Sequence, residues 1–298
     1  MLKSISNSQN KLNLLPNLVI IGAMKSGTTS LHSYLDLHPQ IFMSRIKELN
    51  FFVEEENWSR GLEWYKSNFE QPAQIIGESS PNYTKYPFFK GVAQRMHSLI
   101  PDAKLIYIVR DPIKRIVSHY IHRVADGLEK RSFTEALADD WQTNHVITSS
   151  QYYRQLEQYL EYYSPDRILV ISLEDLARDS QPNAKAQGIN TLRSVFQFLE
   201  VDSDFQHEDF AQVLHSSGAK LKALTPLGAS LSTLPGGKLM QSALFRIVGG
   251  ARASRWLYRR IEQPVLDESL RQKLVDFLAE DVAKLRSFTG RSFADWSL

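Results

Sequence analysis

The 298-residue sequence contains no cysteine. Disulfide bonds, thiolate zinc sites and a cysteine nucleophile are therefore excluded. The sequence also has no apolar run that approaches the roughly 18–20 residues of a membrane-spanning helix. Residues 1–10 are polar and lack the apolar segment of a signal peptide. Together these absences predict a cytoplasmic protein with no transmembrane segment.

An excess of charge of one sign is also nearly absent, because 35 Lys and Arg residues stand against 33 Asp and Glu residues, a net charge of +2. Nucleic-acid binding needs basic residues clustered on one face, and outside residues 216–262 they are dispersed, so no nucleic-acid partner is expected. Hydrophobic residues at 43% and charged residues at 23% are typical of globular proteins. We predict a single domain over residues 1–298 and leave the oligomeric state open.

Short apolar runs alternate along the chain with segments of helical periodicity. The runs predict buried strands at residues 18–21, 74–77, 105–109 and 167–171. The periodic segments predict helices at residues 28–37, 112–124, 133–140, 152–163, 190–199 and 267–288. This alternation predicts an α/β fold of three layers, with a central parallel sheet flanked by helices. In such sheets ligands bind at the carboxyl ends of the strands.

Two segments fall outside this pattern. Residues 1–13 are predicted to be a loose leader. Residues 216–262 are rich in glycine and in basic side chains, which is typical either of a surface insertion with solvated charges or of a flexible flap over a site. For residues 216–220 the flap is the favoured interpretation.

The sequence GAMKSGTTS, residues 22–30, joins the first predicted strand to the first predicted helix. Successive backbone amides and a helix N-terminus at such a junction form an anion site. Lys25 adds a positive charge. Four hydroxyl side chains add donors, namely Ser26, Thr28, Thr29 and Ser30. The alternative is a glycine turn with ordinary Ser/Thr helix caps, but the strand, helix and lysine together favour an anion site.

This junction differs from the Walker A motif, G-x-x-x-x-G-K-[ST], in which the lysine follows the second glycine. Here Lys25 precedes Gly27, and no lysine follows it before the helix. The hydroxyl that would hold magnesium in an NTPase therefore lacks its partner lysine. A P-loop kinase or NTPase stays an alternative, and magnesium dependence would distinguish it.

The second motif, VRDPIKRIVSHYIH at residues 109–122, begins where the strongest predicted strand ends. Arg110 lies at that strand end, where a guanidinium can hold a phosphate through paired N–H bonds. Pro112 is typical of the first turn of a helix. Ser118 and His122 are four residues apart and share one helical face. Taken alone, this motif fits an alternative equally well. In that alternative Arg110 pairs with a carboxylate and Ser118 is exposed.

Together the two motifs resemble the sulfotransferases that use 3′-phosphoadenosine 5′-phosphosulfate (PAPS). KSGTTSL at residues 25–31 is similar to the family's 5′-phosphosulfate loop, and Arg110 with Ser118 is similar to its 3′-phosphate site. Three further pieces resemble the heparan-sulfate-type and bacterial branch: KELNFF at residues 47–52, GESSPNY at residues 77–83, and Ser217-Gly218 with Lys220.

The resemblance implies a P-loop-like fold and the transfer of a sulfuryl group from PAPS to a hydroxyl or amine. Lys25 would neutralise charge on the leaving group. Residues 26–30 would hold the 5′-phosphate, while Arg110 and Ser118 would hold the 3′-phosphate. Ser217, Gly218 and Lys220 would close over the nucleotide. Such transfer depends on positioning and charge stabilisation, and no metal is expected because the transferred sulfonate carries less charge than a phosphate.

The acceptor needs a base, and two candidates match the family's pattern. Glu48 matches the branch that places a glutamate there, and Phe51 and Phe52 could form an apolar wall that raises its pKa. His122, one turn beyond Ser118, is the second candidate. The chain departs from the heparan-type pattern at Val53 and Ser79, at positions that the resemblance implies would contact the acceptor.

The acceptor itself is predicted to be a small molecule, a glycolipid or a saccharide. A non-catalytic nucleotide-binding protein is the remaining alternative. The presence in one chain of all the candidate catalytic and phosphate-binding side chains argues against it.

Overall fold

The computed structural model describes residues 14–179, 191–211, 222–224, 258–261 and 263–298. Four sequence-based predictions lie wholly or mostly outside these residues. They are the leader at residues 1–13, most of the flap at residues 216–262, the start of the helix at residue 190, and the nucleotide contacts of Ser217, Gly218 and Lys220.

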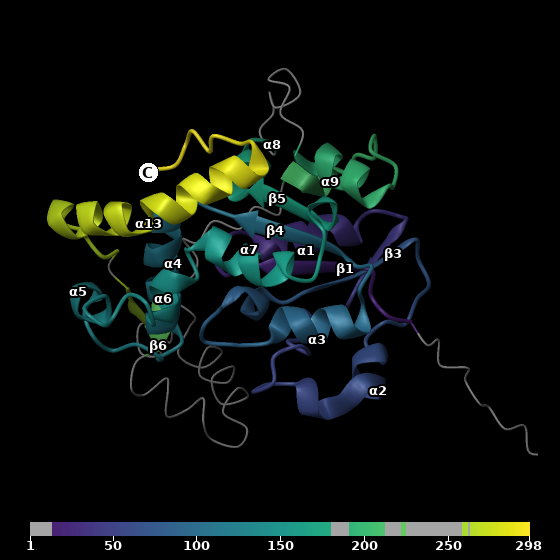
Figure 1. The fold of residues 1–298 in the computed structure, drawn as a ribbon, viewed down its shortest axis with the longest axis horizontal. Coiled ribbons are helices and arrows are strands. Elements are labelled where there is room, and N and C mark those ends of the chain that lie inside the picture. The colour runs from purple at the N-terminus through teal and green to yellow at the C-terminus, as the bar shows by residue number, and fades with distance from the viewer. Residues whose placement is uncertain (1–13, 180–190, 212–221, 225–257, 262) are drawn as a thin grey trace, which may run out of the picture.

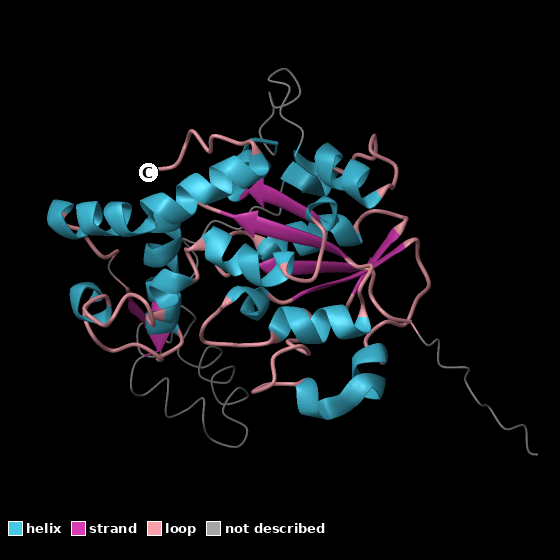
Figure 2. Ribbon diagram, in the orientation of Figure 1, coloured by secondary structure: helices cyan, strands magenta, loops and turns pink. Residues whose placement is uncertain are grey.

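A parallel sheet forms the centre of the molecule (Figure 2). Its five strands lie in the order β2-β3-β1-β4-β5. The strands are β1 (Leu18–Gly22), β2 (Ile41–Met43), β3 (Ile75–Ser79), β4 (Lys104–Val109) and β5 (Ile168–Ser172). Every pairing between neighbours is parallel. The four predicted strands and the parallel sheet are confirmed. Strand β2 was not predicted, because three residues are too few for a period.

The strands are apolar throughout because both faces of the sheet are covered. In β1, Leu18 and Ile20 pack on one side, while Val19 and Ile21 pack on the other, and none of the four is exposed to solvent. The first side is covered by α1 (Thr28–Asp36), α8 (Leu173–Asp179) and α9 (Thr191–Leu199).

The opposite face is covered by α2 (Gly61–Lys66), α3 (Val92–Leu99), α7 (Tyr152–Leu160) and α13 (Glu268–Thr289). Its core is rich in aromatic rings, from Phe51 and Phe52 to Trp296. Helices on both faces of a parallel sheet confirm the three-layer fold (Figure 1). None of the described helices is long and apolar enough to cross a membrane.

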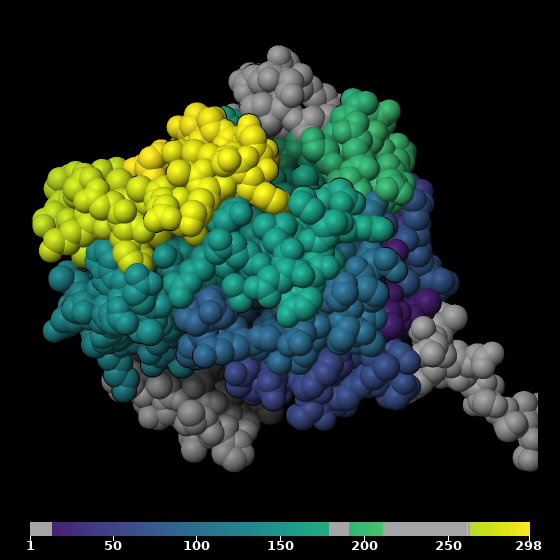
Figure 3. Space-filling model, in the orientation of Figure 1, coloured from purple at the N-terminus to yellow at the C-terminus, as the bar shows by residue number. Residues whose placement is uncertain are grey.

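A third cluster of apolar side chains lies beyond the sheet, among α4 (Pro112–Ala125), α5 (Phe133–Ala136), α6 (His145–Thr148) and α13. The long helix α13 lies across the surface and packs on both α4 and α7 (Figure 3). Its start and end match the predicted helix to within one residue. Asp267 caps the N-terminus by accepting a bond from the Leu270 amide, and Gly290 ends the helix in the left-handed conformation.

Short elements complete the described chain. The 3-10 turns are η1 (Trp58–Arg60), η2 (Pro81–Thr84), η3 (Pro165–Arg167) and η5 (Glu208–Ala211). Within the predicted flap, β6 (Lys222–Leu224) pairs in an antiparallel manner with β7 (Tyr258–Arg260), and β6 lies against α4. Neither strand was predicted.

Two predicted helices are too long at their C-termini. The helix expected at residues 133–140 ends at Ala136, because Asn144 donates to the Ala136 carbonyl and the Trp141 indole donates to the Leu137 carbonyl. These side chains occupy acceptors that a longer helix would use. The helix expected at residues 152–163 ends at Leu160, although the Tyr163 amide still donates to the Tyr159 carbonyl at 2.8 Å.

Candidate active site

The loop between β1 and α1 requires glycine at two positions. A β-carbon on Gly22 would lie 2.0 Å from Thr84 Oγ1, and one on Gly27 would lie 2.6 Å from Leu173 Cδ1. Gly27 also has a φ of 93°, in the left-handed region that glycine adopts at little cost. Glycine at these two positions lets the loop lie close to Thr84, which follows β3, and to Leu173, which follows β5.

Three hydroxyl side chains of this loop are turned inward, since Ser26 is 0%, Thr28 5% and Ser30 6% exposed. Thr29 is exposed. The first amides of α1 have no partners within the helix and point out of its N-terminus, where the helix dipole favours an anion. No acidic side chain lies in that first turn. The loop thus has the electrostatics of an anion site, as the sequence predicts.

Lys25 lies at the apex of this loop and is half-buried. Its φ is 71°, a left-handed conformation that a non-glycine residue adopts at a cost of about 1–2 kcal/mol. Such conformations persist where the surroundings enforce them and are concentrated at functional sites.

Arg110 is brought to the same place because β4 pairs directly with β1. Its Nη1 donates to the Lys25 carbonyl at 3.4 Å. Tyr152, at the start of α7, fixes the strand end by donating its hydroxyl to the Arg110 carbonyl at 2.7 Å. The Tyr152 ring is buried beside Ser26, whose buried Oγ approaches its hydroxyl without a well-formed hydrogen bond. The two predicted phosphate-binding motifs are therefore neighbours in space.

Helix α4 follows Arg110 at once and carries the next two candidates. Asp111 caps it, with Oδ1 accepting from the Lys114 amide and Oδ2 from the Ser297 amide. Ser118 is half-buried two turns along. One turn further, His122 Nε2 lies 3.3 Å from Asp126 Oδ2. The shared helical face of Ser118 and His122 agrees with their spacing.

Arg115 on the same helix was not singled out by sequence reasoning. Its guanidinium is 0% exposed and forms no ion pair in the described part of the chain. It donates instead to the Ser150 hydroxyl, the Val146 carbonyl and, at 3.4 Å, the Met24 carbonyl in the phosphate loop. Burial lowers the pKa of Arg115. A charged side chain on the buried stripe of an amphipathic helix is the sequence signal that could have identified it.

Glu48 lies on a separate loop that follows β2. Its amide donates to the Ser79 carbonyl at 2.9 Å, and this contact places the residue at the carboxyl end of β3. Its carboxylate is 48% exposed and forms an ion pair with Lys47 at 2.7 Å. Like Lys25, it is a non-glycine residue with a left-handed backbone, at a φ of 66°.

The apolar wall expected around Glu48 is not formed by the two phenylalanines. Phe51 and Phe52 are buried in the core, where Phe51 stacks on Tyr65 at 4.2 Å and Phe52 packs against Tyr83. Their rings point into the core because the loop reverses between Glu48 and Asn50, both of which have positive φ.

Lys85 is a further basic group on this side that sequence reasoning missed. Burial lowers its pKa to about 8, and Glu56, Arg115 and Glu48 lie within electrostatic range of it.

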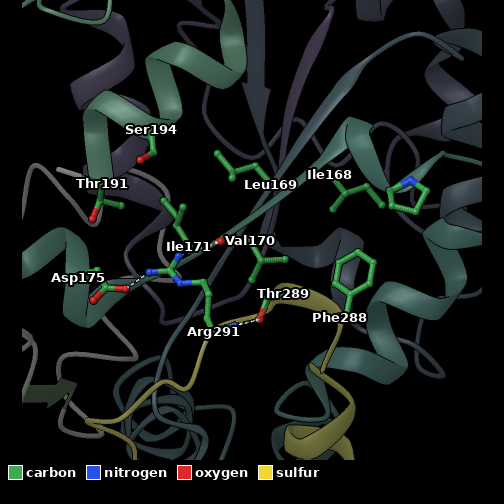
Figure 4. A pocket seen from close by; sticks show the side chains of 11 residues that line it. Ile168, Leu169, Val170, Ile171, Asp175, Thr191, Ser194, Phe288, Thr289 and Arg291 are labelled. Atoms are coloured by element: carbon green, nitrogen blue, oxygen red, sulfur yellow. Dashed lines mark hydrogen bonds and ion pairs between the residues drawn. The ribbon is translucent and has the colours of Figure 1, made fainter. Parts of the chain in front are cut away.

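A hollow bordered by described residues lies elsewhere, along the outer edge of β5 (Figure 4). Its volume is about 520 Å³, and Arg291 crosses it to reach Asp175 and the Val170 carbonyl. None of the predicted site residues lines it.

Comparison with known proteins identifies the family. The family described as the sulfotransferase domain matches residues 15–244. This chain belongs to the sulfotransferase family. The matched range contains β1 to β5, the loop with Lys25, and Arg110 with α4.

Individual relatives are consistent with this membership. Heparan sulfate glucosamine 3-O-sulfotransferase 5 of Homo sapiens is 34% identical over 180 residues, which are 56% of this chain and 51% of that protein. Bifunctional heparan sulfate N-deacetylase/N-sulfotransferase 2 of Homo sapiens is 25% identical over 317 residues, covering 99% of this chain and 32% of that protein. The chain thus spans about half the length, or less, of these relatives.

A solved structure supports the fold over nearly the whole chain. The crystal structure of a sulfotransferase from Alicyclobacillus acidocaldarius has a TM-score of 0.66 and 26% identity. The match covers 96% of this chain and 100% of that one. The sequence-based prediction of a P-loop-like α/β sulfotransferase fold is confirmed.

Proposed function

We propose that this protein transfers a sulfuryl group from PAPS to a hydroxyl or amine of a saccharide or small-molecule acceptor. The observation that carries the proposal is the contact between the two anion-binding elements. Arg110 at the end of β4 donates to the carbonyl of Lys25 in the β1–α1 loop. A donor with phosphates at both ends of its ribose needs two such elements close together.

The donor-binding roles follow from the chemistry of each side chain. The amides at the start of α1, with Ser26, Thr28, Thr29 and Ser30, would hold the 5′-phosphate. Arg110 and Ser118 would hold the 3′-phosphate, since a guanidinium can donate two parallel bonds to it. Ser217, Gly218 and Lys220 stay predicted nucleotide contacts.

Lys25 would act on the leaving group. In the proposed step the acceptor atom forms a bond to sulfur, and the bond from sulfur to the bridging oxygen of the 5′-phosphate breaks. The electron pair of that bond goes to 3′,5′-adenosine bisphosphate, and the Lys25 ammonium stabilises the charge that develops there. The proton of the acceptor goes to a base.

Glu48 is the base in this proposal. Its half-exposed carboxylate is accessible to an acceptor, and its backbone is held at the carboxyl end of β3, which pairs with β1. His122 lies on α4 with its Nε2 3.3 Å from Asp126 Oδ2. It is the alternative base that the experiment below must separate from Glu48.

The acceptor class rests on the relatives and on charge. The two human relatives are named for heparan sulfate, a saccharide. Lys85 adds positive charge within electrostatic range of Glu48, which suits an acceptor that is itself anionic. The departures at Val53 and Ser79 leave small-molecule acceptors in the proposal.

Transfer of label from radiolabelled PAPS tests the proposal. The acceptor panel comprises heparosan, N-desulfated heparan sulfate, a glucosamine glycoside and p-nitrophenol. We expect label in at least one acceptor without added metal, strongly reduced transfer in Glu48→Gln, and retained transfer in His122→Asn. Transfer that survives in Glu48→Gln but fails in His122→Asn would assign the base to His122. An absence of transfer to every acceptor, together with no binding of PAPS, would contradict the function.

A cytoplasmic location, a single domain over residues 1–298 and independence from metal ions stay predictions from the sequence.

A further inference from the structure

Glu78 is a buried carboxylate with no role so far in the proposed chemistry. It lies in β3 with 0% exposure, on the face of the sheet that carries the aromatic core. Three hydroxyls donate to it: Tyr65 at 2.7 Å and Tyr83 at 2.8 Å to Oε1, and Ser80 at 2.7 Å to Oε2. Burial raises its pKa, while the three hydroxyl donors act in the opposite direction.

Such a group is expensive to place in a core. Transfer of a carboxyl from water into apolar surroundings is unfavourable even when hydrogen bonds compensate, and an apolar replacement is often as stable. Stability alone therefore gives no reason for a glutamate here, and its contacts point to another role.

Two of the three hydroxyls continue the network to the main chain of the Glu48 loop. Ser80 Oγ accepts from the Asn50 amide at 3.0 Å, and the Tyr83 hydroxyl accepts from the Phe52 amide at 3.5 Å. A third bond, from the Glu48 amide to the Ser79 carbonyl, lies beside them. The amides of Glu48, Asn50 and Phe52 thus all donate hydrogen bonds to residues 79–83.

The carboxylate decides which way these hydroxyls point. Ser80 and Tyr83 both direct their hydroxyl protons toward the carboxyl oxygens of Glu78. Their lone pairs are then left to accept from amides. Without Glu78 the hydroxyl protons would be free to turn, and the two amides would lose fixed acceptors.

The loop needs such fixing because its backbone is unfavourable. Glu48 and Asn50 have φ values of 66° and 47°. Left-handed backbone costs about 1–2 kcal/mol for each non-glycine residue, and surrounding contacts must hold it. The Ser80 bond to Asn50 is made at one of these two residues.

We propose that Glu78, acting through Ser80 and Tyr83, is a positioning residue that holds the Glu48 loop in the conformation that sulfuryl transfer requires. This inference rests on the proposed function, in which Glu48 is the base. Glu78 itself touches neither donor nor acceptor in the proposal.

Ser80→Ala tests the link, with Tyr65→Phe as the matched control. Each removes one hydroxyl donor to Glu78, but only Ser80 also accepts from the Glu48 loop. With the most active acceptor of the panel above, we expect Ser80→Ala to lower kcat at least about tenfold, since small misplacements of reacting groups have effects of that size. We expect Tyr65→Phe to lower kcat far less, and both to bind 3′,5′-adenosine bisphosphate as the parent does.

A double-mutant cycle separates positioning from general damage. In the Glu48→Gln background, Ser80→Ala should lower residual turnover no further, because its effect runs through Glu48. Equal kcat losses in Ser80→Ala and Tyr65→Phe, or an undiminished effect of Ser80→Ala without Glu48, would overturn the inference. If Glu48→Gln alone keeps full turnover, the premise fails and the inference fails with it. If Glu48→Gln is inactive while Ser80→Ala is fully active, only the inference fails.

Discussion

The two sides of the candidate active site are built in different ways. The donor side consists of two short contiguous stretches, the β1–α1 loop and the turn from Arg110 into α4, at the ends of adjacent strands. The acceptor side depends on a loop held by a buried network that joins residues 48–52 to residues 78–83. The proposed donor side combines backbone amides with side chains of its own two motifs, whereas the Glu48 loop is held by hydrogen bonds to distant side chains.

This difference bears on what each side can tolerate. Helix N-termini and strand ends bind anions through groups that every sequence possesses. A loop in left-handed conformation depends on particular distant side chains. We therefore expect donor binding to survive most substitutions outside the two motifs, and turnover to be lost more widely.

Lys25→Ala should have the largest effect. Loss of the charge that stabilises the leaving group should lower kcat by about 10²–10³, as removal of one oxyanion donor does. Transfer from labelled PAPS measures it, with Lys66→Ala on α2 as the control, because Lys66 forms an ion pair with the exposed Glu63 on the same helix. A Lys25→Ala enzyme with near-parental kcat would remove Lys25 from the chemistry.

Asp281→Asn tests a distant support of the turn that carries Arg110. Asp281 accepts from the amides of Tyr153 and Arg154 and so caps α7, whose first residue, Tyr152, holds the Arg110 carbonyl. Burial raises the pKa of Asp281 to about 6, against the bonds from those two amides. The protonated form is therefore favoured on folding. This contribution to stability is fully present below the unfolded pKa and is lost as pH rises through about 6.

Asparagine does not titrate, so the two proteins should differ in their pH dependence. The unfolding free energy of the parent minus that of Asp281→Asn should fall by about 3 kcal/mol between pH 3.5 and 7, at about 1.4 kcal/mol per unit of pKa shift. Urea unfolding at a series of pH values measures it. A difference that is constant or rises with pH would show that Asp281 is not buried as a protonated cap.

Arg110→Ala sharpens the assignment of the 3′-phosphate site. Hydrogen bonds to charged groups contribute about 1.5–3 kcal/mol, so the affinity for 3′,5′-adenosine bisphosphate should fall roughly 10- to 100-fold. Affinity for adenosine 5′-monophosphate should change little. Calorimetry on both ligands measures this, and equal losses for the two would place Arg110 away from the 3′-phosphate.

Gly27→Ala should have the smallest effect of the four substitutions, and the effect should be on the free energy of unfolding. Alanine is strained at a φ of 93°, and its β-carbon would lie against Leu173. The substitution should therefore lower the unfolding free energy by about 1–2 kcal/mol. Gly127→Ala is the control, since Gly127 also has positive φ but has no atom within 4 Å of an added β-carbon. Donor affinity should fall in the first variant alone. Equal behaviour of both would mean that the close approach to Leu173 is unimportant for the loop.

The proximity of the two motifs of the proposed donor side could be predicted from the sequence because their signals are local. A glycine, lysine and hydroxyl-rich turn after an apolar run, and an arginine at the end of another, are each visible within about ten residues. The parallel sheet then places them together, since the carboxyl ends of its strands share one edge. The contact between Arg110 and Lys25 is the result.

The supports of the site could not be predicted in this way. Tyr152 reaches Arg110 from α7, and Asp281 reaches α7 from α13, across long separations in the chain. Nothing in the sequence around Tyr152 distinguishes it from a core tyrosine. The burial of Phe51 and Phe52 away from Glu48 was missed for a related reason, since it follows from positive φ at Glu48 and Asn50, residues that ordinarily avoid it.

We propose that the paired anion sites at Lys25 and Arg110 bind a nucleotide with both a 3′- and a 5′-phosphate. Calorimetric titration with 3′,5′-adenosine bisphosphate, with ATP plus magnesium as the comparison, tests this binding. We expect the bisphosphate to bind without metal and ATP to bind much more weakly. Preference for magnesium-ATP would contradict the proposed function and assign the site to a kinase or NTPase.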